Sequence, residues 1–309
     1  MAQLKTWISA FRLRTLPLSI SGAIVGSSYA HHLGYFDFTV FVLIIITTLS
    51  FQILSNLAND YGDGIKGTDN DFRIGPERAL QSGAISSKQM KNAIIINAVL
   101  CAVLAIVLVY VAFGVSQLIN SLIFIVLGGL SIYAAITYTV GKSAYGYKAL
   151  GDLMVFLFFG WLSVLGTHFL FTKELNLTLL LPASAIGFLS TAVLNLNNMR
   201  DLETDLKSNK ITLAGHLGIR NSKIYHFTLI LSAIGLMIVF QFSISFSKIM
   251  YLSWMAFLPL LFHLKSVFFI KNPKDFDPHL KLVALSTFFL AILFAVALIF
   301  HNLQPENFV

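Results

Sequence analysis

Nine predominantly apolar stretches limit this chain to one kind of structure. Each is about 20 residues long, the length that a helix needs to cross the hydrocarbon core of a bilayer. Only 11% of the residues are charged, against about a quarter in soluble proteins. The sequence therefore predicts an all-α integral membrane protein, a single domain over residues 1–309, whose nine transmembrane helices form a bundle. The predicted helices are 15–33, 38–58, 91–113, 117–139, 149–171, 176–197, 224–246, 249–270 and 280–301.

The positions of Lys and Arg predict the orientation of these helices. All but two of the 21 basic residues fall in segments that the helix order places on one face, and the exceptions are Lys173 and Lys248. Cytoplasmic loops retain basic residues, so we expect a cytoplasmic N-terminus and an external C-terminus. The net charge of +7 suits an anionic inner leaflet, and nothing in its pattern suggests binding of nucleic acid.

Acidic residues cluster on this same face. The two longest polar segments, at about 59–90 and 198–223, hold eight of the 14 acids. Acidic residues at a helix end are commonly just solvated. The concentration of eight acids in two segments of so apolar a chain nevertheless requires an explanation. The eight are Asp60, Asp63, Asp69, Asp71 and Glu77 in the first segment and Asp201, Glu203 and Asp205 in the second.

The spacing of these acids places them on helix faces. If the second predicted helix continues past residue 58, Asp60 and Asp63 share one face with Asn56, at i, i+4 and i+7. Asn198, Asp201 and Asp205 share a face in the same way after the sixth helix. The two motifs lie four helices apart, which hints at two similar four-helix halves.

Carboxylates held this close together need a compensating positive charge. Mg²⁺ is typically bound by one or two carboxylates together with substrate phosphate oxygens, whereas zinc sites are typically built from His and Cys, which form no cluster beside these acids. Formal charges balance when two Mg²⁺ ions and nearby basic residues face a diphosphate. The pattern therefore predicts a magnesium-dependent site for a diphosphate substrate, with basic partners at Arg73, Arg78, Lys142 and Lys207.

These motifs resemble those of a known family. "NLANDYGDGIKGTD" (56–69) and "NNMRDLETDLKSNKITLAGHLG" (197–218) are similar to the first and second Asp-rich motifs of the UbiA superfamily of intramembrane aromatic prenyltransferases. Within it, "RIGPERALQSGAIS" (73–86) and "YTVGKSAYGYKALGDLMVFLFFG" (138–160) resemble the 1,4-dihydroxy-2-naphthoate polyprenyltransferases of menaquinone synthesis. The resemblance runs from "RLRTLPLSISG" (12–22) to the ninth helix and implies a UbiA-like bundle around a central polar cavity.

The resemblance also implies the ligands of the Mg²⁺–diphosphate. It assigns them to Asn56, Asn59, Asp60 and Asp63 of the first motif and to Asp201 and Asp205 of the second. The chain departs from the family at two positions. Many members have a further Asp where this chain has Gly67, and Asp69 is the candidate replacement. The naphthoate branch often has Pro where this chain has Lys142, and a basic residue there is similar to other branches.

The remaining site residues are assigned by the chemistry of an allylic diphosphate. Its departure leaves a carbocation, and basic side chains stabilise the charge that collects on the leaving group. We expect Arg73 and Lys207 to contact the diphosphate, with weaker contacts from Arg78 and Lys210, and Lys142 to contact either the diphosphate or the aromatic acid. Asp152 either orients or deprotonates a ring hydroxyl or simply favours a helix N-terminus. Tyr138 and Tyr147 either face the cation or pack.

Two classes of function follow. The first is a transferase that joins a polyprenyl diphosphate to 1,4-dihydroxy-2-naphthoate with loss of the carboxylate, giving demethylmenaquinone, or joins it to 4-hydroxybenzoate or another phenolic acceptor. The second is a secondary transporter, whose acids should lie near the bilayer midplane. Acids at helix ends on one face favour the enzyme.

Overall fold

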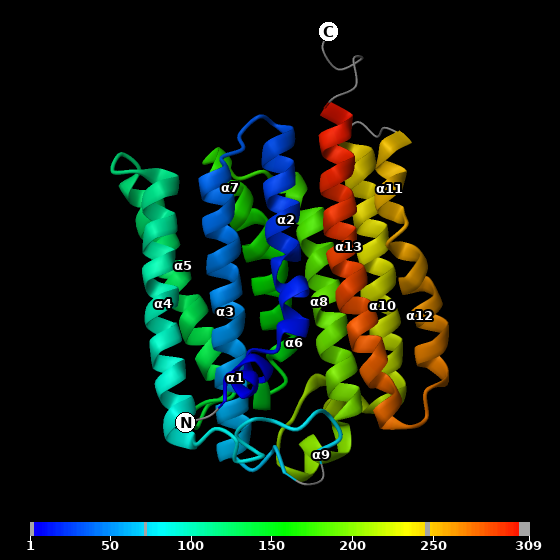
Figure 1. The fold of residues 1–309 in the computed structure, drawn as a ribbon. Helices are drawn as coiled ribbons and strands as arrows, with labels where there is room; N and C mark the ends of the chain where they lie inside the picture. Colours follow the sequence, from blue (N-terminus) through cyan, green and yellow to red (C-terminus); the bar gives the residue numbers. More distant parts are fainter. Residues whose placement is uncertain (1–2, 71–72, 245–247, 303–309) are drawn as a thin grey trace.

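The computed structural model describes residues 3–70, 73–244 and 248–302, and these are almost wholly helical (Figure 1). One isolated bridge, between Lys148 and Ile211, is the β-structure within those ranges. The longer helices are α1 (Leu4–Phe11), α2 (Leu16–His32), α3 (Phe38–Ile65), α4 (Ser87–Phe113), α5 (Leu118–Thr137), α8 (Leu180–Arg200), α10 (Leu213–Ser243), α12 (Phe257–Phe269) and α13 (Asp277–Asn302). The shorter ones are η1 (Leu13–Thr15), η2 (Tyr145–Tyr147), α6 (Gly151–Val155), the π-helical η3 (Phe156–Gly166), α7 (Thr167–Thr172), η4 (Leu177–Leu179), α9 (Leu202–Lys207), η5 (Lys248–Met250), α11 (Tyr251–Trp254) and η6 (Pro273–Phe276).

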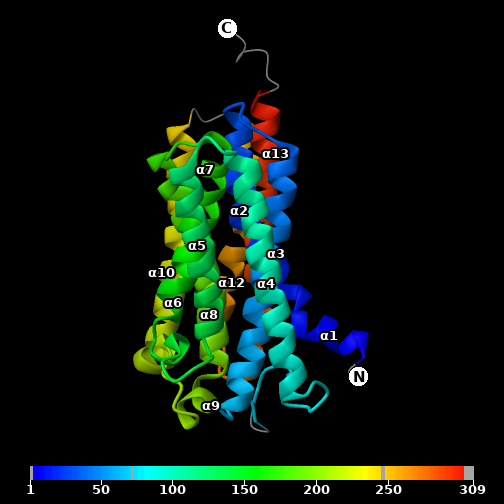
Figure 2. The same ribbon diagram turned by 90° about the vertical axis from the view of Figure 1, so that its left-hand side faces the viewer.

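The predicted all-α membrane bundle is confirmed. Among the described residues, eight helical segments are long and apolar enough to cross a membrane. The difference from the predicted nine concerns the stretch 15–33, which forms α2. This helix has only 17 residues, yet it runs alongside the others (Figures 1 and 2) and packs against α13 and η3. Its serines and glycines are buried by neighbouring helices rather than facing lipid.

Helices α3 and α10 extend furthest beyond their predicted limits, and the extension of α3 carries the first acids. Helix α3 starts where Asp37 accepts a hydrogen bond from the Val40 amide, 2.9 Å away, and runs to Ile65. Asn56, Asp60 and Asp63 therefore share one helix face, as the spacing predicted. Helix α10 starts at Leu213 but has a kink at Gly218, where φ is +71°. The kink separates its first turn from the apolar part that the sequence identified.

Close packing of small residues joins the π-helical segment η3 to the central helix α8. A Cβ atom built on Gly160 would lie 2.6 Å from the Ala183 carbonyl oxygen and 2.7 Å from Gly187 Cα. Small residues let helix backbones approach this closely, and such contacts are a main source of stability between membrane helices. The interface therefore depends on the absence of a side chain at residue 160.

We expect Gly160→Ala to lower the free energy of unfolding by about 1–3 kcal/mol, because the added methyl group overpacks a backbone contact that cannot relax. The measurement is the thermal midpoint of the purified protein in detergent. Gly129→Ala is the matched control, since a Cβ at Gly129 in α5 meets no atom within 4 Å. Equal midpoints for the two variants would contradict the importance of this contact.

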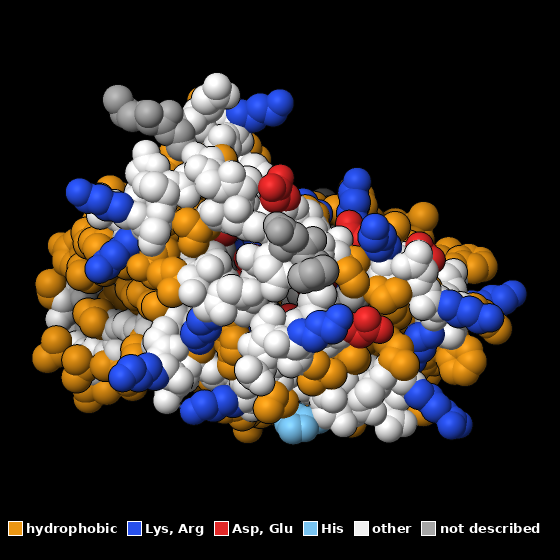
Figure 3. Space-filling view, turned by 90° about the horizontal axis from the view of Figure 1, so that it is seen from below, with side chains coloured by type: hydrophobic (Ala, Val, Ile, Leu, Met, Phe, Trp, Pro, Cys, Tyr) orange, Lys and Arg blue, Asp and Glu red, His pale blue; other side chains and the backbone are white. Residues whose placement is uncertain are grey.

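The two ends of the bundle differ in charge. The N-terminal helix and the loops after α3 and α8 lie at the lower end in Figure 1, and Lys and Arg side chains are spread over this face in Figure 3. The segments that hold Lys173 and Lys248, after α7 and before α11, lie at the upper end with the C-terminus. Most basic residues thus lie at one end of the bundle, and Lys173 and Lys248 lie at the other end, as the sequence predicted.

Candidate active site

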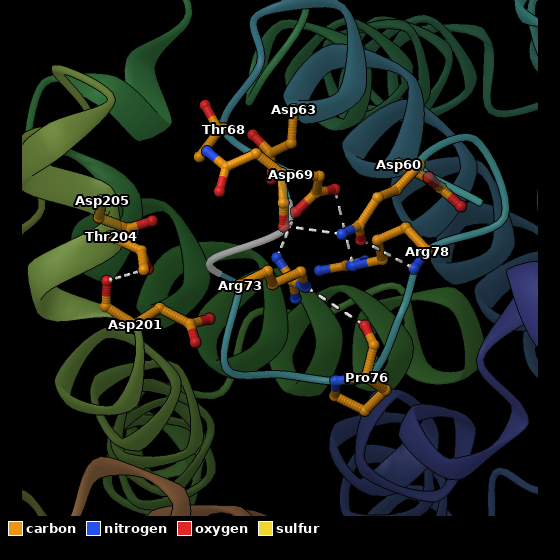
Figure 4. Close-up of polar contacts among 12 residues, drawn as sticks. Asp60, Asp63, Thr68, Asp69, Arg73, Pro76, Arg78, Asp201, Thr204 and Asp205 are labelled. Atoms are coloured by element: carbon orange, nitrogen blue, oxygen red, sulfur yellow. Dashed lines mark hydrogen bonds and ion pairs between the residues drawn. The ribbon is translucent and has the colours of Figure 1, made fainter. Parts of the chain in front are cut away.

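A polar cavity of about 650 Å³ opens among the helices at the basic end of the bundle. Its walls come from the segment α1–η1, the end of α3, the loop after α3, the end of α8 and the start of α13. Both acidic motifs reach this region from opposite sides: in Figure 4, Asp60, Asp63 and Asp69 lie on one side, and Asp201 and Asp205 lie on the other. The cavity is therefore where the two predicted motifs meet.

The carboxylate of Asp60 is held by backbone donors. It lies on α3 and is 1% exposed. Its Oδ2 accepts a hydrogen bond from the Ala79 amide at 3.2 Å, and its Oδ1 accepts one from the Leu80 amide at 3.4 Å. These contacts fasten the loop after α3 onto the helix that carries the first motif.

Arg12 supplies positive charge beside Asp60. Its backbone has φ of +51°, in the left-handed region that non-glycine residues rarely adopt, and its Nη2 lies 3.5 Å from the Asn56 carbonyl oxygen. Burial lowers the pKa of Arg12 to about 10, with the charge of Asp60 opposing the shift. Asn56 donates to Phe11 O at 2.9 Å and to Thr15 Oγ1 at 3.1 Å, so this predicted substrate contact fixes the N-terminal segment.

Lys210 joins the two motifs. Its Nζ lies 3.7 Å from Asp63 Oδ2 and 3.5 Å from Asp205 Oδ1. Burial alone would lower the pKa of Lys210, but the charges of Asp63 and Asp205 outweigh it and raise this pKa above its ordinary value. The Tyr147 hydroxyl donates to Asp63 Oδ1 at 2.8 Å and lies 2.6 Å from Thr68 Oγ1. Two helices far apart in sequence are thereby tied through one ammonium group.

Asp69 anchors the loop after α3 to two arginines. Its Oδ1 forms an ion pair with Nη1 of Arg73, and its Oδ2 lies 3.8 Å from Nε of Arg78. Arg73 also donates from Nε to the Pro76 carbonyl oxygen at 3.2 Å (Figure 4). Burial raises the pKa of Asp69 to about 6, while the charge of Arg73 opposes the shift. The neighbouring Asp71 lies outside the described residues.

Asp201 is paired with its own neighbour in the chain. Arg200 donates to both of its oxygens, from Nε at 2.8 Å and from Nη2 at 2.7 Å. Arg200 also donates to Asp277 Oδ1 at 2.6 Å and to Asn197 Oδ1 at 2.8 Å. Its side chain is 2% exposed. This arginine therefore connects the end of α8 to the start of α13 across the cavity wall.

The remaining predicted residues divide into two groups. Asn59 and Tyr138 line the polar cavity, and the Asn59 side chain accepts a hydrogen bond from Thr139 at 3.4 Å. Lys142, in the loop after α5, and Lys207, at the end of α9, are exposed and do not line it. Asp152 is buried at the start of the segment α6–α7, and its backbone carbonyl accepts a hydrogen bond from Thr191 of α8. Lys142, Lys207 and Asp152 thus lie away from the cavity wall. Asn56, Asp69, Tyr147 and Asp205 are not part of the lining either, but each contacts a residue that is.

Sequence reasoning did not assign a site role to Arg12 or Arg200, although both line the cavity. A signal was present for each. Arg200 directly precedes Asp201 inside the second motif, and Arg12 opens the stretch "RLRTLPLSISG". The sequence does not indicate that the α1–η1 segment folds back against α3.

A second, apolar chamber of about 230 Å³ adjoins the polar cavity. It extends between α3, α4, α5 and η3, and most of its wall is aliphatic or aromatic. Gln52, Tyr138, Val155 and Phe159 line both spaces. A molecule with a charged head and a long apolar tail could therefore extend from one space into the other past these four residues.

The carboxylates of this site fit a hard divalent cation that is shared with a substrate. Asp205 Oδ2 is buried and has no hydrogen-bond partner among the residues that the structure describes, and burial raises the pKa of Asp205 to about 6. Within residues 3–70, 73–244 and 248–302, no three His, Cys, Asp or Glu side chains come close enough to form a cage for a metal ion. Carboxylates on opposite walls instead suit Mg²⁺, whose other ligands are phosphate oxygens and water.

Comparison with known proteins identifies the family. The profile of the UbiA prenyltransferase family matches residues 19–293. A 1,4-dihydroxy-2-naphthoate octaprenyltransferase of Escherichia coli is 46% identical over 78% of each chain, and one of Haemophilus influenzae is 39% identical over 96% of each. The apo structure of a UbiA homolog from Aeropyrum pernix has the same fold, with a TM-score of 0.68 at 14% identity over 94% of this chain and 98% of that one. The chain belongs to the UbiA prenyltransferase family.

Proposed function

We propose that the protein transfers a polyprenyl group from polyprenyl diphosphate to 1,4-dihydroxy-2-naphthoate, with loss of the carboxylate. The observation that carries the proposal is the meeting of Asp63 and Asp205, one from each acidic motif, at Lys210 on the wall of a cavity that adjoins an apolar chamber. The names of the relatives that are 46% and 39% identical support this choice of acceptor.

We assign the acidic residues to the cation and the basic ones to the diphosphate. Asp60, Asp63, Asp201 and Asp205 would hold Mg²⁺, with Asp69 as a further candidate. When bound, Mg²⁺ neutralises the charge that collects on the leaving diphosphate. Arg73 and Arg78 of the loop after α3, and Lys210 between the two motifs, line the cavity and would contact the diphosphate oxygens. Arg12 adds positive charge beside Asp60, and Arg200 adds it beside Asp201.

The reaction needs one bond broken before another forms. The bond between the allylic carbon and the diphosphate oxygen breaks, and its electrons stay with the diphosphate. The ring carbon that bears the carboxylate then bonds to the allylic carbon, and CO₂ leaves while its bonding electrons return to the ring. Tyr138 lies at the junction of the two spaces, where its ring could stabilise the allylic cation. The product is the reduced form of demethylmenaquinone.

The position of the acids disfavours a transporter. Asp60 and Asp63 lie in the last turns of α3, and Asp201 directly follows α8. A transporter would hold such groups near the bilayer midplane. A transferase for 4-hydroxybenzoate shares the whole diphosphate site and differs only in the pocket for the ring, so the choice of acceptor rests on the relatives.

We place the protein in a bacterial cytoplasmic membrane as a single functional domain. The gathering of Lys and Arg at one end of the bundle (Figure 3) supports a cytoplasmic N-terminus and active site and an external C-terminus. One cavity is lined by residues from both the first and the last long helices, which supports one domain.

We expect purified protein to transfer labelled prenyl groups to 1,4-dihydroxy-2-naphthoate only when Mg²⁺ is present. The measurement is the labelled lipid product, with EDTA-treated protein and 4-hydroxybenzoate as the two comparisons. Transfer to 4-hydroxybenzoate instead would keep the reaction and change the acceptor. Folded protein that prenylates neither phenol would refute the proposed function.

A further inference from the structure

The turn after α9 holds Lys210 between the two acidic motifs. Asn209 has φ of +54°, an uncommon conformation outside glycine that Asn adopts more readily than most residues. The backbone amide of Lys210 then donates to the Asp205 carbonyl oxygen at 2.9 Å. This reversal turns the Lys210 side chain inward, where the residue is 8% exposed. Three residues earlier, Lys207 is exposed to solvent.

Lys210 contacts the same oxygens that a divalent cation would use. Its ammonium lies 3.7 Å from Asp63 Oδ2 and 3.5 Å from Asp205 Oδ1, and the second oxygen of Asp205 has no partner among the described residues. An ammonium and a dication repel each other at contact distance in a site this poorly solvated. A cation that binds Asp63 and Asp205 must therefore displace the ammonium.

A displaced Lys210 has one suitable partner nearby. Its four-carbon stem is flexible and its charge is compact, so the ammonium can move without rearrangement of the backbone. The carboxylates of Asp63 and Asp205 and the ring of Tyr147, 5.7 Å away, lie around the Lys210 ammonium. An incoming diphosphate would offer the anionic oxygens that the lysine has given up.

We propose that Lys210 is the internal counter-ion of the paired acidic motifs and that it moves from Asp63 and Asp205 to the substrate diphosphate when the divalent cation binds. This inference rests on the proposed function. It implies that cation and diphosphate bind cooperatively. The cation displaces the Lys210 ammonium from the carboxylates, and the diphosphate provides that ammonium with a new anionic partner. The cation alone binds weakly, since the ammonium competes for its ligands.

The test uses Mn²⁺ as the cation and inorganic pyrophosphate as the anion, with the full-length protein in detergent. Bound Mn²⁺ is measured by electron paramagnetic resonance, after correction for the Mn²⁺–pyrophosphate complex in solution. We expect pyrophosphate to tighten Mn²⁺ binding to the unmodified protein about tenfold or more. Lys210→Met should bind Mn²⁺ alone about tenfold more tightly and lose most of the enhancement by pyrophosphate, which corresponds to a coupling of typical size.

Lys207→Met is the matched control, because it removes the same charge from the same segment at an exposed position. It should bind Mn²⁺ as the unmodified protein does. Unchanged or weaker Mn²⁺ binding by folded Lys210→Met would overturn the proposal. If that variant does not fold, the titration of the unmodified protein still decides, because an absence of enhancement by pyrophosphate also overturns it. Neither titration contains an acceptor, so a failure of prenyl transfer would refute the function separately.

Discussion

Replacing Asp63 with alanine is expected to lower kcat/KM for prenyl transfer by a factor on the order of a thousand. Lys210 lies between Asp63 and Asp205, and Asp63 accepts a hydrogen bond from Tyr147. The change therefore removes a proposed cation ligand and the partner of both Lys210 and Tyr147. The measurement is the initial rate of labelled product formation at saturating Mg²⁺. Asp201→Ala should cause a loss of similar size, because the proposed function assigns the cation to carboxylates of both motifs.

Glu203→Ala controls for the loss of one negative charge. Glu203 lies on α9 between Asp201 and Asp205, is exposed, and does not line the cavity. The rate of prenyl transfer by Glu203→Ala should stay within about twofold of the rate of the unmodified protein, since exposed charges interact weakly through water. Each variant is first compared by its thermal midpoint. An active, folded Asp63→Ala protein would contradict the assignment of the first motif.

Replacing Arg200 with leucine should cause the largest loss of stability, about 3–5 kcal/mol, because it leaves a buried carboxylate without its partner. Arg200 donates to both oxygens of Asp201 and also to Asp277, so the contact between the end of α8 and the start of α13 weakens as well. The measurement is the thermal midpoint of the purified variant in detergent.

Arg220→Leu is the comparison for this change. Arg220 lies on α10 and is exposed, so its replacement should alter the free energy of unfolding by less than about 1 kcal/mol. The double change Arg200→Leu with Asp201→Leu should recover part of the stability, because no unpaired buried charge then remains. A single Arg200→Leu variant as stable as Arg220→Leu would show that this ion pair adds nothing to the fold.

The sequence by itself determined the helices and the placement of the first acids. Apolar stretches of membrane-spanning length predict helices because a backbone in lipid must satisfy its own hydrogen bonds. The spacing of Asn56, Asp60 and Asp63 predicts a shared face because an α-helix repeats every 3.6 residues. Both inferences rest on neighbours in the chain, and the structure bears them out as far as Ile65.

Only the tertiary structure decided which basic residues meet the acids. The sequence analysis expected a stronger diphosphate contact from Lys207 than from Lys210, yet in the structure Lys210, which follows the left-handed turn at Asn209, is buried and Lys207 is exposed. Arg12 reaches the cavity because the N-terminal segment packs against α3, about 45 residues later in the chain. These contacts between basic and acidic residues depend on the packing of segments far apart in sequence, and no local periodicity predicts them.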